Sequence, residues 1–169
     1  MSSDAELKNA RMVYYAEDIK TLEQVLDRLL DLSRAKRAML IDIEGHMVAN
    51  RGSGADHLDV QSISALVAGT FAATKATAKL LGEEEFSVLF HQGEKESMYL
   101  VDVARRVILV ALFDNRTTLG LVRLKMKATV EELTRIFEEM FNRAGTETPK
   151  LEGFGSQEAE DEIDKLFGD

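Results

Sequence analysis

The sequence predicts an α+β domain in which a five-stranded antiparallel sheet is sandwiched by one helix on one face and two helices on the other. Three segments repeat apolar residues every three or four positions, as amphipathic helices do. Five short apolar runs lie between them, and Val107–Phe113 is apolar throughout, which is typical of a central strand buried on both faces. This order of elements packs most economically as one sheet covered on both sides.

The first helix and a hairpin are predicted from local patterns. The helix is expected over Glu17–Arg34, with apolar residues at Ile19, Leu22, Val25, Leu26, Leu29, Leu30 and Leu32. The apolar runs Ala38–Ile43 and His46–Ala49 flank the turn residues Glu44 and Gly45, and this arrangement indicates a hairpin.

A second helix and three strands are expected in the middle of the chain. Residues Leu58–Leu81 are rich in alanine and leucine and contain no proline, and Gly82 is predicted to end this helix as its C-cap. Strands are predicted over Glu85–His91, Ser97–Val103 and Arg106–Asp114, with a tight link between the last two.

Residues Leu119–Lys127 fit two periods. Their apolar positions partly alternate as in a strand, but a helical spacing continues unbroken through Val122, Met126, Val130, Leu133, Ile136, Phe137 and Met140. We therefore predict one helix from Thr118 to Asn142, with Thr118 as its N-cap. The first and third helices are expected to share one face of the sheet, and the second helix to cover the other.

Composition indicates a globular protein of the reducing cytoplasm. The 169 residues include 45% hydrophobic and 30% charged residues and no cysteine, which excludes disulfides and cysteine-ligated metals. No apolar run approaches the roughly 18 residues of a membrane span, and the N-terminus lacks the apolar region of a secretory signal. The net charge of −9 argues against a nucleic-acid partner.

The acidic charge lies mainly in a C-terminal tail. Residues 152–169 carry seven carboxylates and one lysine, so the rest of the chain carries only −3. We expect an extension over residues 1–13, a domain over 14–143, a linker with Pro149 over 144–155 and an acidic amphipathic helix over 156–169. Ile163, Leu166 and Phe167 form one apolar edge, which predicts a segment that folds on a partner rather than a purely solvated end.

No set of residues in the sequence resembles a catalytic or metal centre. His46, His57 and His91 are scattered over turns and strand ends. The run Asp42–His46 has ligand-type side chains, but Asp, Glu and Gly are also what a hairpin turn needs. The loop Gly52–Gly54 lacks the lysine and the spacing of a phosphate loop. We therefore expect a non-enzyme without catalytic residues, cofactor or metal.

Two features suggest protein binding, and each has an alternative. Arg116 follows the central strand, where it either acts as an arginine finger or pairs locally while Asp114, Asn115 and Thr118 cap the chain. A stripe of small residues on the second helix, with Ala68 and Ala73 nearby, either packs on the protein's own sheet or faces a partner. We call these residues the small-residue stripe: Ala65, Gly69, Ala72 and Ala76.

Five further segments are distinctive: Phe113-Asp-Asn-Arg-Thr-Thr-Leu-Gly-Leu-Val-Arg-Leu-Lys-Met-Lys127, Glu132-Leu-Thr-Arg-Ile-Phe137, Lys79-Leu-Leu-Gly-Glu-Glu-Glu-Phe86, Phe90-His-Gln-Gly93 and Asp161-Glu-Ile-Asp-Lys-Leu-Phe167. Together they resemble the MglB family of bacterial polarity regulators, within the Roadblock/dynein-light-chain superfamily. The resemblance covers nearly the whole chain from about Tyr14.

The resemblance implies a Roadblock fold and a homodimer whose sheets join edge to edge. Two copies of such a protein bind one small Ras-like GTPase of the MglA type and accelerate its GTP hydrolysis, while the GTPase supplies the catalytic residues. The C-terminal helix, through Ile163, Leu166 and Phe167, grips a second site. The GTPase-binding residues expected on the second helix are Ala65, Ala68, Gly69, Ala72, Lys75, Ala76 and Lys79. The family's role in polarity and motility implies a cytoplasmic protein, also found at a cell pole.

Two other functions compete with GTPase activation. One is a scaffold or adaptor that binds a GTPase or motor complex without stimulating hydrolysis. The other is a small-molecule sensor of the related profilin-like architecture, which a cavity under the second helix would support.

Overall fold

The computed structural model describes residues 13–54 and 57–146. The chain divides into two units, residues 1–137 and 138–169, and each is described by itself. The elements are α2 (Ala16–Ser33), β1 (Arg37–Asp42), β2 (Met47–Gly52), α3 (Val60–Leu80), β3 (Val88–Gln92), β4 (Ser97–Val103), β5 (Val107–Phe113) and α4 (Leu119–Thr146). Their order confirms the predicted one, while the predicted tail helix lies outside the described residues.

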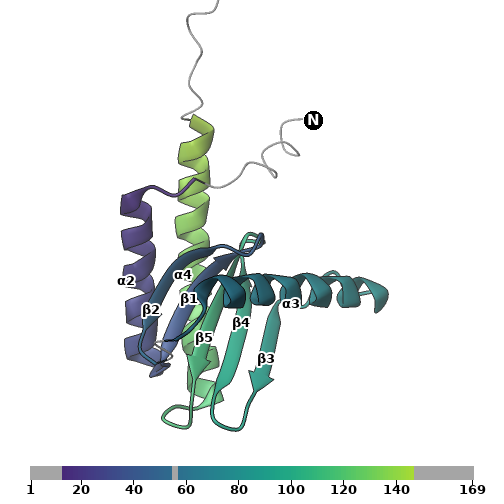
Figure 1. The fold of residues 1–169 in the computed structure, drawn as a ribbon. Helices are drawn as coiled ribbons and strands as arrows, with labels where there is room; N and C mark the ends of the chain where they lie inside the picture. Colours follow the sequence, from purple (N-terminus) through teal and green to yellow (C-terminus); the bar gives the residue numbers. More distant parts are fainter. Residues whose placement is uncertain (1–12, 55–56, 147–169) are drawn as a thin grey trace, which may run out of the picture. The chain divides into compact units, whose positions relative to one another are not determined.

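The five strands form one antiparallel sheet in the order β2-β1-β5-β4-β3. The strand predicted to be central, β5, lies in the middle and is buried along its length except at Leu112, which is half-buried. Figure 1 shows α3 crossing one face of the sheet, whereas α2 and the first part of α4 cover the other. The predicted sandwich of one helix and two helices is therefore confirmed.

Alternation along the strands divides the core between the two faces. The face under α3 holds one cluster, made of Met39, Ile41, Val67, Phe71, Leu100, Ile108 and Val110. The opposite face buries the intervening sheet residues against apolar side chains of the other two helices, such as Leu22 and Leu26 of α2 and Val122 and Met126 of α4. Burying each large apolar side chain contributes about 1.5–3 kcal/mol to folding, so the packing on both faces of the sheet stabilises the domain.

Capping side chains set the ends of α3 and α4. The Asp59 carboxylate accepts hydrogen bonds from the backbone N–H and the hydroxyl of Ser62 at the start of α3. At its end Gly82 has φ +80°, and the N–H of Glu83 donates to the Ala78 carbonyl at 3.0 Å, as in a Schellman motif. The Thr118 hydroxyl accepts from the N–H of Leu121 at 3.2 Å, which confirms the predicted N-cap of α4.

Several element boundaries differ from the predicted ones, and β2 runs to Gly52 instead of ending at Ala49. Strand β3 begins at Val88 instead of Glu85, although the Ser87 carbonyl still accepts a hydrogen bond from the Asp102 N–H. Helix α4 runs to Thr146, because no proline occurs before Pro149. Helix α3 begins at Val60, after its Asp59 cap. Within the described residues, no helix is long and apolar enough to cross a membrane.

Candidate protein-binding surface on helix α3

The small-residue stripe faces away from the sheet. Ala65, Gly69, Ala72 and Ala76 are all exposed, while Val67 and Phe71 of the same helix are 3% exposed and point into the core. Apart from its own helix backbone and chain neighbours, nothing described lies within 4 Å of where a Cβ on Gly69 would be, so the space beside Gly69 is open. These observations exclude the alternative that the stripe packs on the protein's own sheet.

Two of the seven residues expected to bind a GTPase lie on the inner side of α3. Ala68 is 8% exposed and sits against the β1–β2 turn, so it presents little surface to a partner. Lys75 is half-buried, and its Nζ lies 3.4 Å from the Asp102 carboxylate of β4. The other expected residue outside the stripe, Lys79, is exposed.

The outer face of α3 is apolar and nearly uncharged. No charged residue occurs from Val60 to Thr74, although exposed helix faces in soluble proteins are normally polar. Leu66 is 70% exposed, and Leu80 at the end of the helix is 87% exposed. Large exposed apolar patches are often interaction sites in soluble proteins, so this face is a candidate for one.

Strand β3 is an open edge of the sheet next to this surface. It pairs only with β4 among the described strands, and Val88 and Phe90 are exposed on it. Figure 1 shows α3 running out beyond β3. An unpaired strand edge is a ready template for another strand, so edge and overhanging helix together suit a second protein chain.

Arg116 is held by its own loop. Its Nε lies 3.0 and 3.1 Å from the two oxygens of Asp114, and its backbone N–H also donates to that carboxylate. These hydrogen bonds hold the pKa of the Asp114 carboxyl below its usual range. The expectation that Arg116 pairs locally is thereby confirmed.

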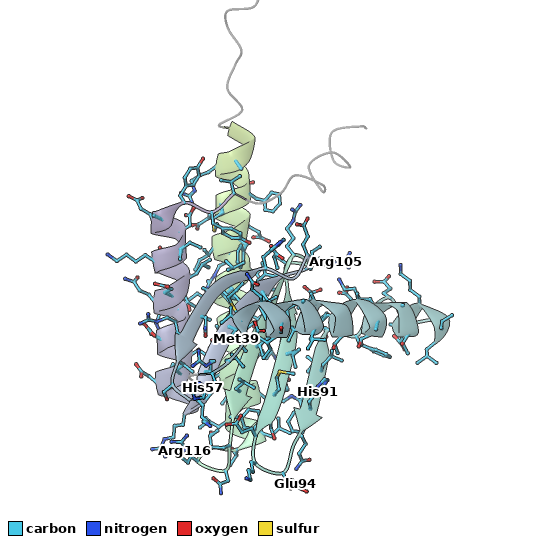
Figure 2. All side chains as sticks on the ribbon, viewed as in Figure 1. Met39, His57, His91, Glu94, Arg105 and Arg116 are labelled. Carbon is cyan, nitrogen blue, oxygen red and sulfur yellow. The ribbon has the colours of Figure 1, made fainter. Side chains whose placement is uncertain are left out.

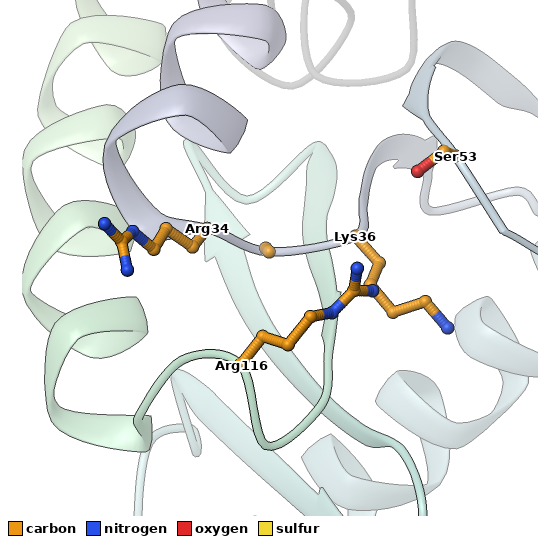
Figure 3. Close-up of a pocket in the computed structure, with 5 residues that line it drawn as sticks. Arg34, Lys36, Ser53 and Arg116 are labelled. Atoms are coloured by element: carbon orange, nitrogen blue, oxygen red, sulfur yellow. The ribbon is translucent and has the colours of Figure 1, made fainter.

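The same loop borders a pocket shown in Figure 3, which is lined by Arg34, Ala35, Lys36, Ser53 and Arg116. Lys36 forms an ion pair with Glu96, as Arg116 does with Asp114. Two of the three cations are therefore already paired within the chain, and none of the residues that line the pocket belongs to α3.

The group Asp42, Glu44 and His46 is explained by turn chemistry. The Asp42 carboxylate accepts hydrogen bonds from the N–H groups of Glu44 and His46 at 3.0 and 2.9 Å, as the turn prediction expects. Ligand atoms of all three lie within 4.8 Å of one another, but Glu44 and His46 are exposed. The other histidines, His57 and His91, are exposed on separate segments (Figure 2).

Gly52 serves a close backbone approach rather than a ligand. Its φ is +119°, and a Cβ there would lie 2.3 Å from the Lys36 carbonyl oxygen. The Ser53 N–H donates to that same carbonyl at 2.9 Å. Gly52 is the last residue of β2, so the loop expected over residues 52–54 begins only after it.

Asp102 is a residue that sequence reasoning missed. It shares the α3-facing side of β4 with Met98 and Leu100, and its side chain is 6% exposed. The signal was present, because an acid stood at an alternating position of a strand whose other members on that side are apolar. Its partner, Lys75, is distant in sequence and was not recognisable.

The sequence profile of the Roadblock/LC7 domain matches residues 21–113, which is more than half of the chain. The chain belongs to the Roadblock/LC7 domain family. The match ends at Phe113, so α4 lies beyond it.

Solved structures similar to this Roadblock chain include MglB proteins. MglB of Myxococcus xanthus is 44% identical, with a TM-score of 0.71 over 76% of this chain and 96% of that one. The gliding protein MglB of Thermus thermophilus is 35% identical, with a TM-score of 0.72 over 78% and 98%. An uncharacterised protein of Methanocaldococcus jannaschii is 30% identical over 67% of this chain and all of its own length. The predicted resemblance to MglB is confirmed.

Proposed function

We propose that this protein is a GTPase-activating partner of a small Ras-like GTPase of the MglA type, in bacterial cell polarity and motility. The observation that carries the proposal is the exposed, nearly uncharged outer face of α3, on a fold 44% identical to MglB of Myxococcus xanthus. A flat face of alanine and glycine lets a partner's backbone approach closely, because no long side chain holds it off.

The proposed active species is a homodimer that binds one GTPase. Support comes from the open edge of β3 and from α3, which extends past that edge. Pairing two β3 edges would continue the sheet through both protomers and bring two copies of α3 to the same side. One solved MglB structure is described as a tetrameric arrangement, so related chains do assemble.

The proposed mechanism is positioning in trans. The stripe presses on the mobile switch segments of the GTPase and selects the arrangement in which the GTPase's own catalytic residues stabilise the transition state. Arg116 contributes no arginine finger in this mechanism, since its guanidinium is bound to Asp114 and it is remote from α3 along the chain.

Single-turnover GTP hydrolysis by a purified MglA-type GTPase tests the proposal. Hydrolysis is measured for the GTPase alone, for the GTPase with saturating wild-type protein, and for the GTPase with saturating Arg116→Ala protein. We expect the wild type to stimulate hydrolysis. Arg116→Ala should reduce this stimulation by far less than the roughly 10³-fold loss that removing an arginine finger produces. A thousand-fold loss at unchanged affinity would contradict the mechanism. Binding without any stimulation would mean that the protein is a scaffold.

A further inference from the structure

The Lys75–Asp102 ion pair joins α3 to strand β4 of the sheet. Asp102 is 6% exposed at its side chain, and in the described residues neither carboxylate oxygen accepts a well-aligned hydrogen bond. Lys75 Nζ, at 3.4 Å from Oδ2, is the cation that compensates this buried charge. Burial raises the pKa of Asp102, and the nearby charge of Glu85 raises it further. The charge of Lys75 and a hydrogen bond from the Arg105 backbone lower this pKa.

The pair lies where α3 has few other anchors. The large α3 side chains in the core cluster are Val67 and Phe71, and Ile63 packs against it, so all of them come from the first part of the helix. Beyond Phe71, the buried residue on α3 is Ala78, whose single methyl group gives little resistance to rotation of the helix.

Rotation of α3 matters because the stripe occupies a narrow sector. Ala76 follows Lys75 directly, about 100° further around the helix, and Ala72 precedes it by three residues on the same outer side. Turning the helix about its axis would move Ala72 and Ala76 out of their present outward direction and would separate Lys75 from Asp102. The Lys75–Asp102 contact therefore determines which side of α3, the one with Ala72 and Ala76, faces outward.

We infer that Asp102 is a positioning residue, which holds Lys75 and thereby fixes the second half of α3 with Ala72 and Ala76 facing outward. A buried pair of this kind contributes little net stability compared with apolar residues, but breaking it leaves an uncompensated charge. Its function in this helix is orientation. The consequence for partner binding rests on the proposed function, while the orientation itself does not.

The test compares four proteins: the wild type, Lys75→Met, the conservative Lys75→Arg, and the double variant Lys75→Met with Asp102→Asn. Amide hydrogen exchange across α3 and carbon-13 titration of the Asp102 carboxyl are both measured without partner. Arg28→Met is the matched control, because Arg28 forms an exposed ion pair with Glu132 at 2.9 Å between α2 and α4.

In Lys75→Met we expect the pKa of Asp102 to rise above its wild-type value. In the double variant we expect global stability close to the wild type, with amide exchange over residues 72–80 accelerated by about tenfold. Lys75→Arg should restore wild-type exchange, and Arg28→Met should leave α3 unchanged.

Wild-type exchange in the double variant, or an unchanged titration in Lys75→Met, would overturn the inference. Should Lys75→Met fail to fold, the double variant and Lys75→Arg still decide the result. A wild type that binds no GTPase would contradict the proposed function alone, because both measurements are made on the free protein.

Discussion

Gly52 and Gly69 show how differently two glycines of the same chain are used. At Gly52 the backbone has φ +119°, and a Cβ would lie 2.3 Å from a carbonyl oxygen, whereas at Gly69 a Cβ would meet open space. The first glycine is required by the fold. No contact in the described chain requires the second glycine, although glycine destabilises a helix through its conformational entropy.

Gly52→Ala should therefore destabilise the protein by about 1–3 kcal/mol, because alanine is strained at this φ and collides with the backbone. The same substitution at Gly69 should stabilise it by about 0.5–1 kcal/mol through better helix propensity. Urea unfolding of both variants measures the difference. Equal effects at the two positions would show that the loop relaxes around the added methyl group.

Tyr14 should give the protein a distinct alkaline response. Burial raises the pKa of Tyr14 to about 12, and the charge of Asp42 contributes to the rise. The charge of Arg106 acts in the opposite direction. The pKa of Tyr14 is higher in the folded protein than the unfolded value of 10.0. The contribution of Tyr14 to folding stability is therefore fully present below pH 10.0 and is lost as the pH rises through about 12.

Tyr14→Phe removes this titration while it keeps the ring that packs edge-on against Phe137 at 6.5 Å. We expect the stability difference between the wild type and Tyr14→Phe to be flat up to about pH 9 and then to fall, to the disadvantage of the wild type. Urea unfolding across this range checks the prediction. A constant difference up to about pH 11 would mean that Tyr14 ionises as freely in the folded state as in the unfolded one.

Among the elements, those with strong periodicity were predictable and those set by tertiary contact were not. The apolar run of β5 and the helical spacing of α2 and α4 identified these elements, and Thr118 marked the start of α4. The start of β3 was missed because pairing with β4 decides it. The turn at Ala104 and Arg105 has φ 53° and 59° without glycine, a geometry that local sequence does not indicate.

The candidate surface was predictable only in part. Spacing along α3 identified a stripe of small residues but left open which side faced the sheet. Burial of Val67 and Phe71 decides that question, since the large residues take the inner side. The burial of Ala68 was not predictable, because small size alone does not distinguish an inner alanine from an outer one. The contact of Lys75 was not predictable either, because it depends on an acid in a different element.

The β3 edge and the overhang of α3 predict that the chain is a dimer. Sedimentation should give about 38 kDa at micromolar concentration, twice the 18.8 kDa of one chain. Val88→Lys places a charge on the exposed edge and should shift the protein towards monomer. Leu124→Lys changes a 61% exposed leucine on α4 and should leave the dimer intact. A stable 18.8 kDa species for the wild type would contradict the assembly.

For the whole molecule, we predict that the acidic tail adds to affinity without being needed for folding. Removing residues 150–169 leaves every described helix and strand intact, since α4 ends at Thr146. Binding to the GTPase should weaken, because Ile163, Leu166 and Phe167 each supply about 1.5–3 kcal/mol of burial before the ordering cost is subtracted.

Isothermal titration of the GTPase with intact, truncated and doubly substituted Leu166→Ala/Phe167→Ala protein measures the tail's contribution. The double substitution should reproduce most of the truncation's loss, while Asp164→Asn should only reduce the sensitivity to salt. Equal affinities throughout would mean that the tail is a solvated end.

The central claim is that the outer face of α3 binds the GTPase, and Ala72→Arg tests it most directly. Ala72 is exposed, so the arginine should change the free energy of unfolding by no more than about 0.5 kcal/mol. Ala128→Arg, at an exposed position of α4, is the matched control. Titration of the GTP-loaded GTPase should show wild-type affinity for Ala128→Arg and an affinity about 100-fold weaker or worse for Ala72→Arg. Undiminished binding by a folded Ala72→Arg protein would contradict the account.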